Sequence, residues 1–217
     1  MRINNTSLLL IIPLVMAVFG VADAGFFFQA AVPGSCILIL AFIYRNSLKS
    51  FPDTWFIIAA FLFSIAGDWF LSNKGDSFFR FSFGIGLYLI AHVGYLWFAL
   101  KNGGIHRLFT AVFLAGFLLF FLLGIVPNID DTVLMLAVLL YLLISCVSLG
   151  AAFGTHLSPM VKWLYFLGIA LVVFSDTIIA LKEFMGHQEL DFLISPTYYA
   201  AHISITMSLI KRATGSV

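Results

Sequence analysis

Two aspartates lie inside long apolar runs of this chain, where a charged side chain is least expected. Asp68 follows the run 61–67, and Asp176 follows the run 171–175. The chain holds ten acidic residues, and the other eight fall at the ends of predicted helices or in the connections between them. A carboxylate at membrane depth costs roughly 2.5–3.5 kcal/mol on insertion scales, so such a residue usually faces the interior of a helix bundle and marks a functional site.

Paired carboxyls of this kind could perform general acid–base catalysis. If Asp68 and Asp176 share one pocket, their mutual repulsion and poor solvation would leave one protonated and the other ionised near neutral pH. An acid and a base side by side suit proton transfer to and from a substrate. The alternative is that each aspartate makes a separate helix-packing or helix-end contact, and Ser72 and Asn73 beside Asp68 would suit that role. The matched depth expected for the pair favours catalysis.

A stripe of polar residues follows one face of the predicted helix 80–100. The residues spaced i, i+4, i+8 and i+11 on this face are Gly84, Tyr88, His92 and Tyr95. Gly84 would allow a neighbouring helix to approach closely, and the larger residues would offer hydrogen-bonding groups to the interior. A lone buried histidine is usually a satisfied contact between helices. Because His92 lies among polar aromatic residues, lining a cavity is an equally good interpretation.

The predicted helix 192–210 contributes a further polar set, comprising Tyr198, Tyr199, His202 and Thr206. Either tyrosine alone would also fit the aromatic belt found at membrane interfaces. His202 lies deeper in the helix, and such a belt does not account for it. A milder stripe on another helix is interpreted as a helix–helix contact, and it consists of Tyr141, Ser145 and Ser148.

Basic residues near the aspartates suggest a phosphate site. Lys182 lies less than two turns beyond Asp176, and Lys74 and Arg80 lie just beyond Asp68. These cations could hold the phosphate of a lipid head group while its hydrocarbon tail descends between the helices. The alternative is that their side chains extend to the membrane interface without binding a ligand.

The whole chain is apolar enough to place these residues on membrane-spanning helices. It is 62% hydrophobic and 10% charged, and its mean hydropathy is +1.10. Apolar stretches of about 18–22 residues are long enough to cross the hydrocarbon core. Residues 1–217 are therefore expected to form a single transmembrane domain, an all-α polytopic bundle of eight spans. The predicted spans are 7–22, 26–44, 54–72, 80–100, 106–125, 132–152, 160–182 and 192–210.

Composition also limits the partners and cofactors. A net charge of +1 gives no reason to expect nucleic acid. Cys36 and Cys146 fall within predicted spans, in neither a metal-binding nor a paired pattern, and are expected to pack as small apolar residues. The polar set lacks a compact His/Cys ligand spacing, so no metal or other cofactor is expected. The expected partners are membrane lipids and a lipid substrate, while the sequence does not indicate an oligomeric state.

The distribution of Lys and Arg predicts the orientation. Eight of these residues fall at the termini and in the even-numbered connections, and three fall on the opposite side. This excess places both termini in the cytoplasm, and the protein in the inner membrane if the source is bacterial.

The N-terminal segment has a second interpretation. Arg2, the apolar run 8–19 and the sequence Ala22-Asp23-Ala24 resemble a signal peptide with a small-residue cleavage site. An uncleaved first helix is preferred, because the further spans need no separate export signal.

Taken together, these motifs resemble those of the YhhN-type lysoplasmalogenase family. The likeness covers roughly residues 55–207, and its order and spacing are more specific than any one motif. The matching residues are Ala66-Gly67-Asp68, then Gly84, Tyr88, His92 and Tyr95, then Phe174-Ser175-Asp176 with Ala180 and Phe184, and finally Thr197-Tyr198-Tyr199-Ala200-Ala201. The chain departs from the family pattern at His202, where the family commonly has glutamine.

The resemblance implies hydrolysis of the vinyl ether bond of lysoplasmalogens, with release of a fatty aldehyde and a glycerophospho-base. If the functional residues of the family are transferred to the matching positions of this chain, Asp68 and Asp176 would be the catalytic carboxylates. The substrate site would be lined by His92, Tyr95, Tyr198 and Tyr199. Vinyl ethers hydrolyse through protonation at carbon and an oxocarbenium ion, which suits one acidic and one ionised carboxyl, as in glycosidases.

Two other functions use intramembrane aspartates. A proton-coupled transporter of lipids or small molecules could use Asp68, Asp176 and His92 as a proton relay, although the chain shows no convincing internal repeat. An intramembrane aspartyl protease also places aspartates on different helices. Its Tyr-Asp and Gly-x-Gly-Asp motifs are replaced here by Ser175-Asp176 and Ile65-Ala66-Gly67-Asp68.

Overall fold

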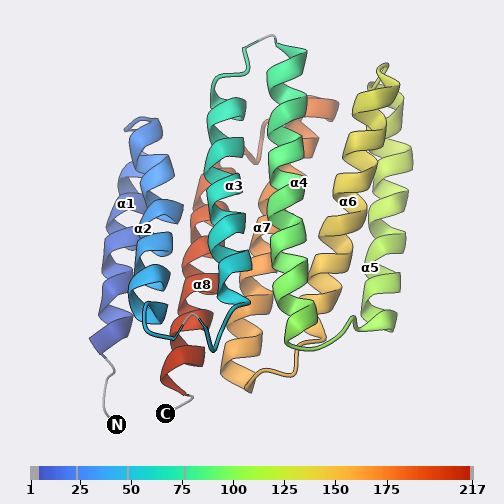
Figure 1. The fold of residues 1–217 in the computed structure, drawn as a ribbon. Helices are drawn as coiled ribbons and strands as arrows, with labels where there is room; N and C mark the ends of the chain where they lie inside the picture. The colour runs from blue at the N-terminus through green and yellow to red at the C-terminus, as the bar shows by residue number, and fades with distance from the viewer. Residues whose placement is uncertain (1–4, 23, 48, 76, 216–217) are drawn as a thin grey trace.

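The computed structural model describes residues 5–22, 24–47, 49–75 and 77–215. Arg2 and Asp23, which enter the predictions of orientation and signal peptide, lie outside the described residues. Within the described part the chain forms eight α-helices (Figure 1). They are α1 (Ile11–Val21), α2 (Phe26–Tyr44), α3 (Thr54–Ser72), α4 (Phe78–Lys101), α5 (Arg107–Phe120), α6 (Thr132–Phe153), α7 (Pro159–Met185) and α8 (Ile194–Thr214).

The all-helical class predicted from the sequence is confirmed. Among the described residues, six helices are long and apolar enough to cross a membrane: α2, α3, α4, α5 with the turns that extend it to Asn128, α6 and α7. Large apolar side chains cover the outside of the bundle, with Phe27 74% exposed and Leu108 72% exposed. An apolar surface of this extent is stable in lipid and not in water. The protein is therefore an integral membrane protein.

Two segments differ from the expected regular spans. The span 106–125 is an α-helix only as far as Phe120, and a π-helical turn (Phe121–Ile125) and a 3₁₀ turn (Val126–Asn128) complete it. Pro127 explains the change, because it lacks an N–H for the helical ladder and constrains the residue before it. At the N-terminal end, a 3₁₀ helix (Asn5–Leu10) precedes α1.

The helices are arranged around a central group of four. In Figure 1, α3 and α4 lie in front of α7 and α8, with α1 and α2 on one side and α5 and α6 on the other. The connections α2–α3, α4–α5 and α6–α7 lie at the end of the bundle where α1 begins and α8 ends. We call this the basal end, and the opposite end, with the α3–α4 and α7–α8 connections, the apical end. The main hydrophobic core includes Tyr44 of α2, Phe61 of α3, Phe98 of α4, Tyr165 of α7 and Leu209 of α8.

Helix α8 is expected from the sequence, yet it is too polar to count among the six helices above. The structure shows the reason. Its Ser204 and Ser208 hydroxyls donate hydrogen bonds to the carbonyls of Leu164 and Val161 on α7, at 2.8 and 2.7 Å. Buried residues occur along most of its length, because α7 and α2 pack against it. A helix surrounded by protein does not need a lipid-facing apolar surface. Hydropathy alone therefore fails to identify α8 as a helix of the bundle.

Close packing of α7 on α8 depends on Gly168, which predicts the effect of a substitution. A Cβ at this position would lie 2.4 Å from Ile205 Cγ1 and 3.0 Å from the Ala201 carbonyl oxygen. Gly168→Val should therefore destabilise the fold by about 1–3 kcal/mol through overpacking. Thermal unfolding in detergent measures this loss, with the lipid-exposed neighbour variant Leu167→Val as control. Equal melting temperatures for the two variants would contradict this account of the contact.

Candidate active site

A cavity of 420 Å³ opens among the apical parts of α3, α4, α7 and α8. Asp68 and Asp176 both line it, although 107 positions separate them in the sequence and they belong to different helices. The α3–α4 connection contributes Lys74, and the segment before α8 contributes Asp191. The structure thus brings the two intramembrane aspartates into one polar hollow near one end of the bundle.

Hydrogen bonds from two tyrosines hold the Asp68 carboxylate. Tyr88 of α4 donates to Oδ1, and Tyr198 of α8 donates to Oδ2 at 3.0 Å. Small residues make this geometry possible. A Cβ on Gly67 would lie 3.2 Å from the Tyr88 ring, and one on Gly84 would lie 3.0 Å from the Leu71 side chain. The close approach of α3 and α4 predicted for Gly84 is therefore present, and it places Tyr88 against Asp68.

The Asp176 carboxylate is held by a histidine and a tyrosine. His92 Nε2 lies 3.1 Å from Asp176 Oδ2, and the Tyr141 hydroxyl donates to the same oxygen. Among the described residues, His92 Nδ1 has no hydrogen-bond partner. A proton on Nε2 fits this environment, because Nε2 then donates a hydrogen bond to Asp176. His92 is thus positioned to fix the orientation of one carboxylate.

Tyr141 is the site residue that the sequence interpretation missed, because its stripe was assigned to helix packing. Ser145 of that stripe bonds within its own helix, because its hydroxyl donates to the Tyr141 carbonyl one turn earlier in α6 at 2.8 Å. The phenol of Tyr141 instead contacts Asp176. The available signal was a polar aromatic residue in the middle of an otherwise apolar span.

The apical opening of the cavity is lined by ion pairs. Lys182 Nζ lies 2.7 Å from Asp191 Oδ2, and Lys74 pairs with Glu183. All four residues line the cavity. The side chain of Lys182 is 39% exposed, so it can exchange its partner for a ligand at little cost. Arg80 differs: it is exposed, donates to the Asn73 carbonyl at 2.7 Å and does not line the cavity.

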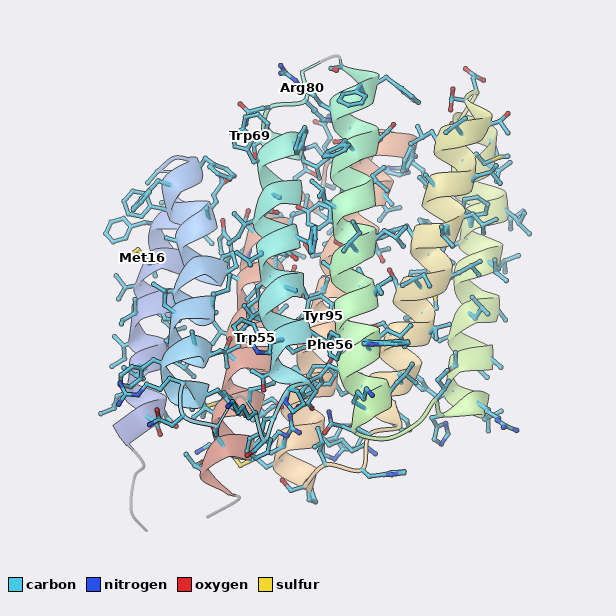
Figure 2. All side chains as sticks on the ribbon, viewed as in Figure 1. Met16, Trp55, Phe56, Trp69, Arg80 and Tyr95 are labelled. Atoms are coloured by element: carbon cyan, nitrogen blue, oxygen red, sulfur yellow. The ribbon has the colours of Figure 1, made fainter. Side chains whose placement is uncertain are left out.

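The remaining predicted site residues divide into two groups. Tyr199 lines the cavity with Tyr198, and a Cβ on Gly20 of α1 would lie 2.9 Å from its hydroxyl. Tyr95 and His202 are buried deeper and do not line the cavity. Figure 2 shows Tyr95 far along α4 from Arg80, toward the basal end.

Both deeper residues support residues nearer the cavity. Tyr95 meets the His92 ring edge-on, with centroids 5.7 Å apart. His202 Nδ1 lies 2.9 Å from the Tyr198 carbonyl oxygen, and its ring packs against Tyr198 with centroids 4.4 Å apart. His202 therefore contacts the helical turn that positions Tyr198.

The fold and the site together define an integral membrane protein with a pair of carboxyls in a polar cavity at one end of a helical bundle. Residues 26–209 match the model of the YhhN family, and the chain belongs to that family. The resemblance inferred from the motifs is therefore confirmed. No curated protein and no solved structure matches the chain.

Proposed function

We propose that this protein is a lysoplasmalogenase, which hydrolyses the vinyl ether bond of lysoplasmalogens to a fatty aldehyde and a glycerophospho-base. The main support for the proposal is that Asp68 and Asp176 line the same cavity. The cavity volume of 420 Å³ falls within the range of about 300–1,000 Å³ typical of small-molecule sites. Membership of the YhhN family is consistent with this activity. It gives no support to the transporter hypothesis.

The chemistry requires one proton donor and one anion. The protonated carboxyl of the pair delivers a proton to the vinyl carbon that is β to the ether oxygen, and the double bond becomes an oxocarbenium ion. The ionised carboxylate stabilises this cation and orients a water molecule for attack. Water adds to the cationic carbon and loses a proton to the carboxylate. The resulting hemiacetal collapses to the aldehyde and the free glycerol hydroxyl.

The residues around the carboxyls assist by positioning them. Tyr88 and Tyr198 fix Asp68, and Tyr141 and His92 fix Asp176, so neither carboxyl has to reorganise during the reaction. The proposed mechanism requires the two carboxyls to act as a unit, one as the proton donor and the other as the anion.

The orientation follows from the arrangement of charge. The loops at the basal end carry Arg45, Lys101, Arg107 and Lys162, whereas the cavity lies at the apical end. We infer from the positive-inside rule that the basal end faces the cytoplasm and that all eight helices cross the membrane. The cavity then opens toward the outer leaflet, where a lysolipid head group would meet Lys74 and Lys182.

Purified protein provides the direct test. It should release a fatty aldehyde from a vinyl ether lysophospholipid, followed with a coupled aldehyde dehydrogenase. The saturated 1-O-alkyl analogue should give no product, because it cannot be protonated at carbon to form the oxocarbenium ion. A folded preparation that releases no aldehyde from vinyl ether lysolipids would refute the proposed function.

Lys182 is expected to contribute to substrate binding through the phosphate. Lys182→Gln should raise KM by about fivefold and leave kcat nearly unchanged, since a partly exposed ion pair is worth about 1 kcal/mol or less. Steady-state kinetics at low ionic strength measure the effect. Arg80→Gln is the matched control, because Arg80 is a cation at the same end of the bundle that does not line the cavity. An unchanged KM for Lys182→Gln would remove this residue from the phosphate site.

A further inference from the structure

A small apolar pocket adjoins the cavity on the far side of Asp176. It has a volume of 60 Å³ and lies between α4, α6 and α7. It shares Leu71, Tyr88, Asp176 and Ile179 with the cavity, so the two spaces meet along this common wall. We call it the side pocket.

The side pocket differs from the cavity in its chemistry. Beyond the shared wall, Tyr141 contributes a polar group, and its hydroxyl is already bonded to Asp176. The other lining residues are hydrocarbon, namely Phe81, Ile85, Val138, Ala180 and Phe184. The cavity, in contrast, is lined by the Lys74–Glu183 and Lys182–Asp191 ion pairs. Asp176 therefore stands at the boundary between a polar space and an apolar one.

We propose that the side pocket binds the first carbons of the alkenyl chain, immediately beyond the vinyl ether bond. This inference rests on the proposed function, because it uses the shape of that substrate. In a lysoplasmalogen the vinyl ether joins a polar glycerophospho head group to a hydrocarbon chain. With the head group in the cavity and the chain in the side pocket, the junction between them lies beside Asp176, where the carboxyl pair acts.

The size of the side pocket limits which part of the chain it controls. An apolar cavity of about 150 Å³ holds one benzene molecule. By that measure 60 Å³ accommodates about two carbons of an unbranched chain. The rest of the chain passes Phe81 and Phe184, which are half-buried, toward the lipid. The pocket therefore selects against branching near the double bond and is indifferent to total chain length.

A binding experiment tests this inference without depending on hydrolysis. The probe is a 1-O-alkyl lysophosphatidylethanolamine with a diazirine three carbons from the ether oxygen, irradiated with the full-length protein in detergent. We expect cross-links to the peptides that contain Ile85, Val138 and Ala180. Cross-links confined to the other side of the cavity, at Gln29 and Tyr199, would overturn the inference.

A pair of variants sharpens the result. Ala180→Leu adds volume to the side pocket and should lower the affinity for the same probe by roughly tenfold, the cost of overpacking a small site. Ala111→Leu adds the same volume on the exposed face of α5 and should bind as the wild type does. Thermal unfolding measurements establish that both variants are folded. Equal affinity of the two folded variants for the probe would overturn the inference. If Ala180→Leu does not fold, the cross-link positions in the wild type decide.

The two proposals fail in distinguishable ways. Aldehyde release from vinyl ether lysolipids together with cross-links away from the side pocket would refute only the proposed position of the alkenyl chain. The hydrolase function would stand. Cross-links in the side pocket without aldehyde release from any such lysolipid would refute the hydrolase function, while the pocket would still bind the chain of an ether lysolipid.

Discussion

Replacing Asp176 by asparagine is expected to lower vinyl ether hydrolysis by about 10²–10⁴-fold, the usual contribution of a general acid or base. Asparagine keeps the shape of the side chain and can still accept the hydrogen bonds from Tyr141 and His92 on one oxygen. It cannot donate an acidic proton or carry negative charge. The loss should appear in kcat, measured by aldehyde release, because the binding surface is preserved.

Stability provides the second readout for Asp176→Asn. Asparagine is never charged and so carries no cost of desolvating a charge in a confined cavity, and the melting temperature should stay the same or rise. Asp53→Asn is the matched control, because the side chains of Asp53 and Asp176 are similarly shielded, at 9% and 10% exposed. It pairs with Arg212 at 2.7 Å and accepts a hydrogen bond from Asn102 at 2.6 Å, away from the cavity. This control should lose stability and keep its activity. An active, destabilised Asp176→Asn protein would assign that residue to structure.

Asp68→Asn is expected to cause a loss of similar size, for a related reason. Tyr88 and Tyr198 each donate to a different oxygen of Asp68. Asparagine offers one acceptor oxygen and an NH₂ group, so one phenol loses its partner, and the side chain can no longer donate or take up a proton. Because the two carboxyls act as a unit, the double variant should be little slower than either single variant.

The pH dependence of the remaining activity separates the roles of the carboxyls. The wild-type rate should fall at high pH, where the acid loses its proton, and at low pH, where the base is protonated. A variant that retains only the acid keeps the high-pH decline, and one that retains only the base keeps the low-pH decline. Multiplicative losses in the double variant, with unchanged profiles in both single variants, would contradict a shared mechanism.

Much of the fold could be predicted because apolar length and polar punctuation determine where a membrane helix begins and ends. Helices α2 and α3 have the predicted bounds, 26–44 and 54–72. The departure at the end of α5 depends on Pro127, whose effect on the preceding turn is not visible in a hydropathy pattern. The marginal hydropathy of α8 reflects its burial by neighbouring helices, which is a property of the assembled bundle.

The candidate site could be predicted in part, for a similar reason. The cost of an intramembrane carboxylate identified Asp68 and Asp176, and helical periodicity identified Tyr88 as a residue of the same face as His92. Periodicity gives the face of one helix but not its neighbour. It therefore could not show that Tyr141 of α6 contacts Asp176, or that Lys182 is paired with Asp191.

The polar character of α8 has a consequence for how the protein is made. This segment follows the other described helices in synthesis, and its own affinity for the bilayer is weak. It is retained mainly by partners that must already be in place, such as the α7 carbonyls of Leu164 and Val161. Because Tyr198 arrives with α8, a nascent chain carries Asp68 in the membrane before the hydrogen bond from Tyr198 can form. The hydrogen bonding of Asp68 is thus completed only when α8 has docked.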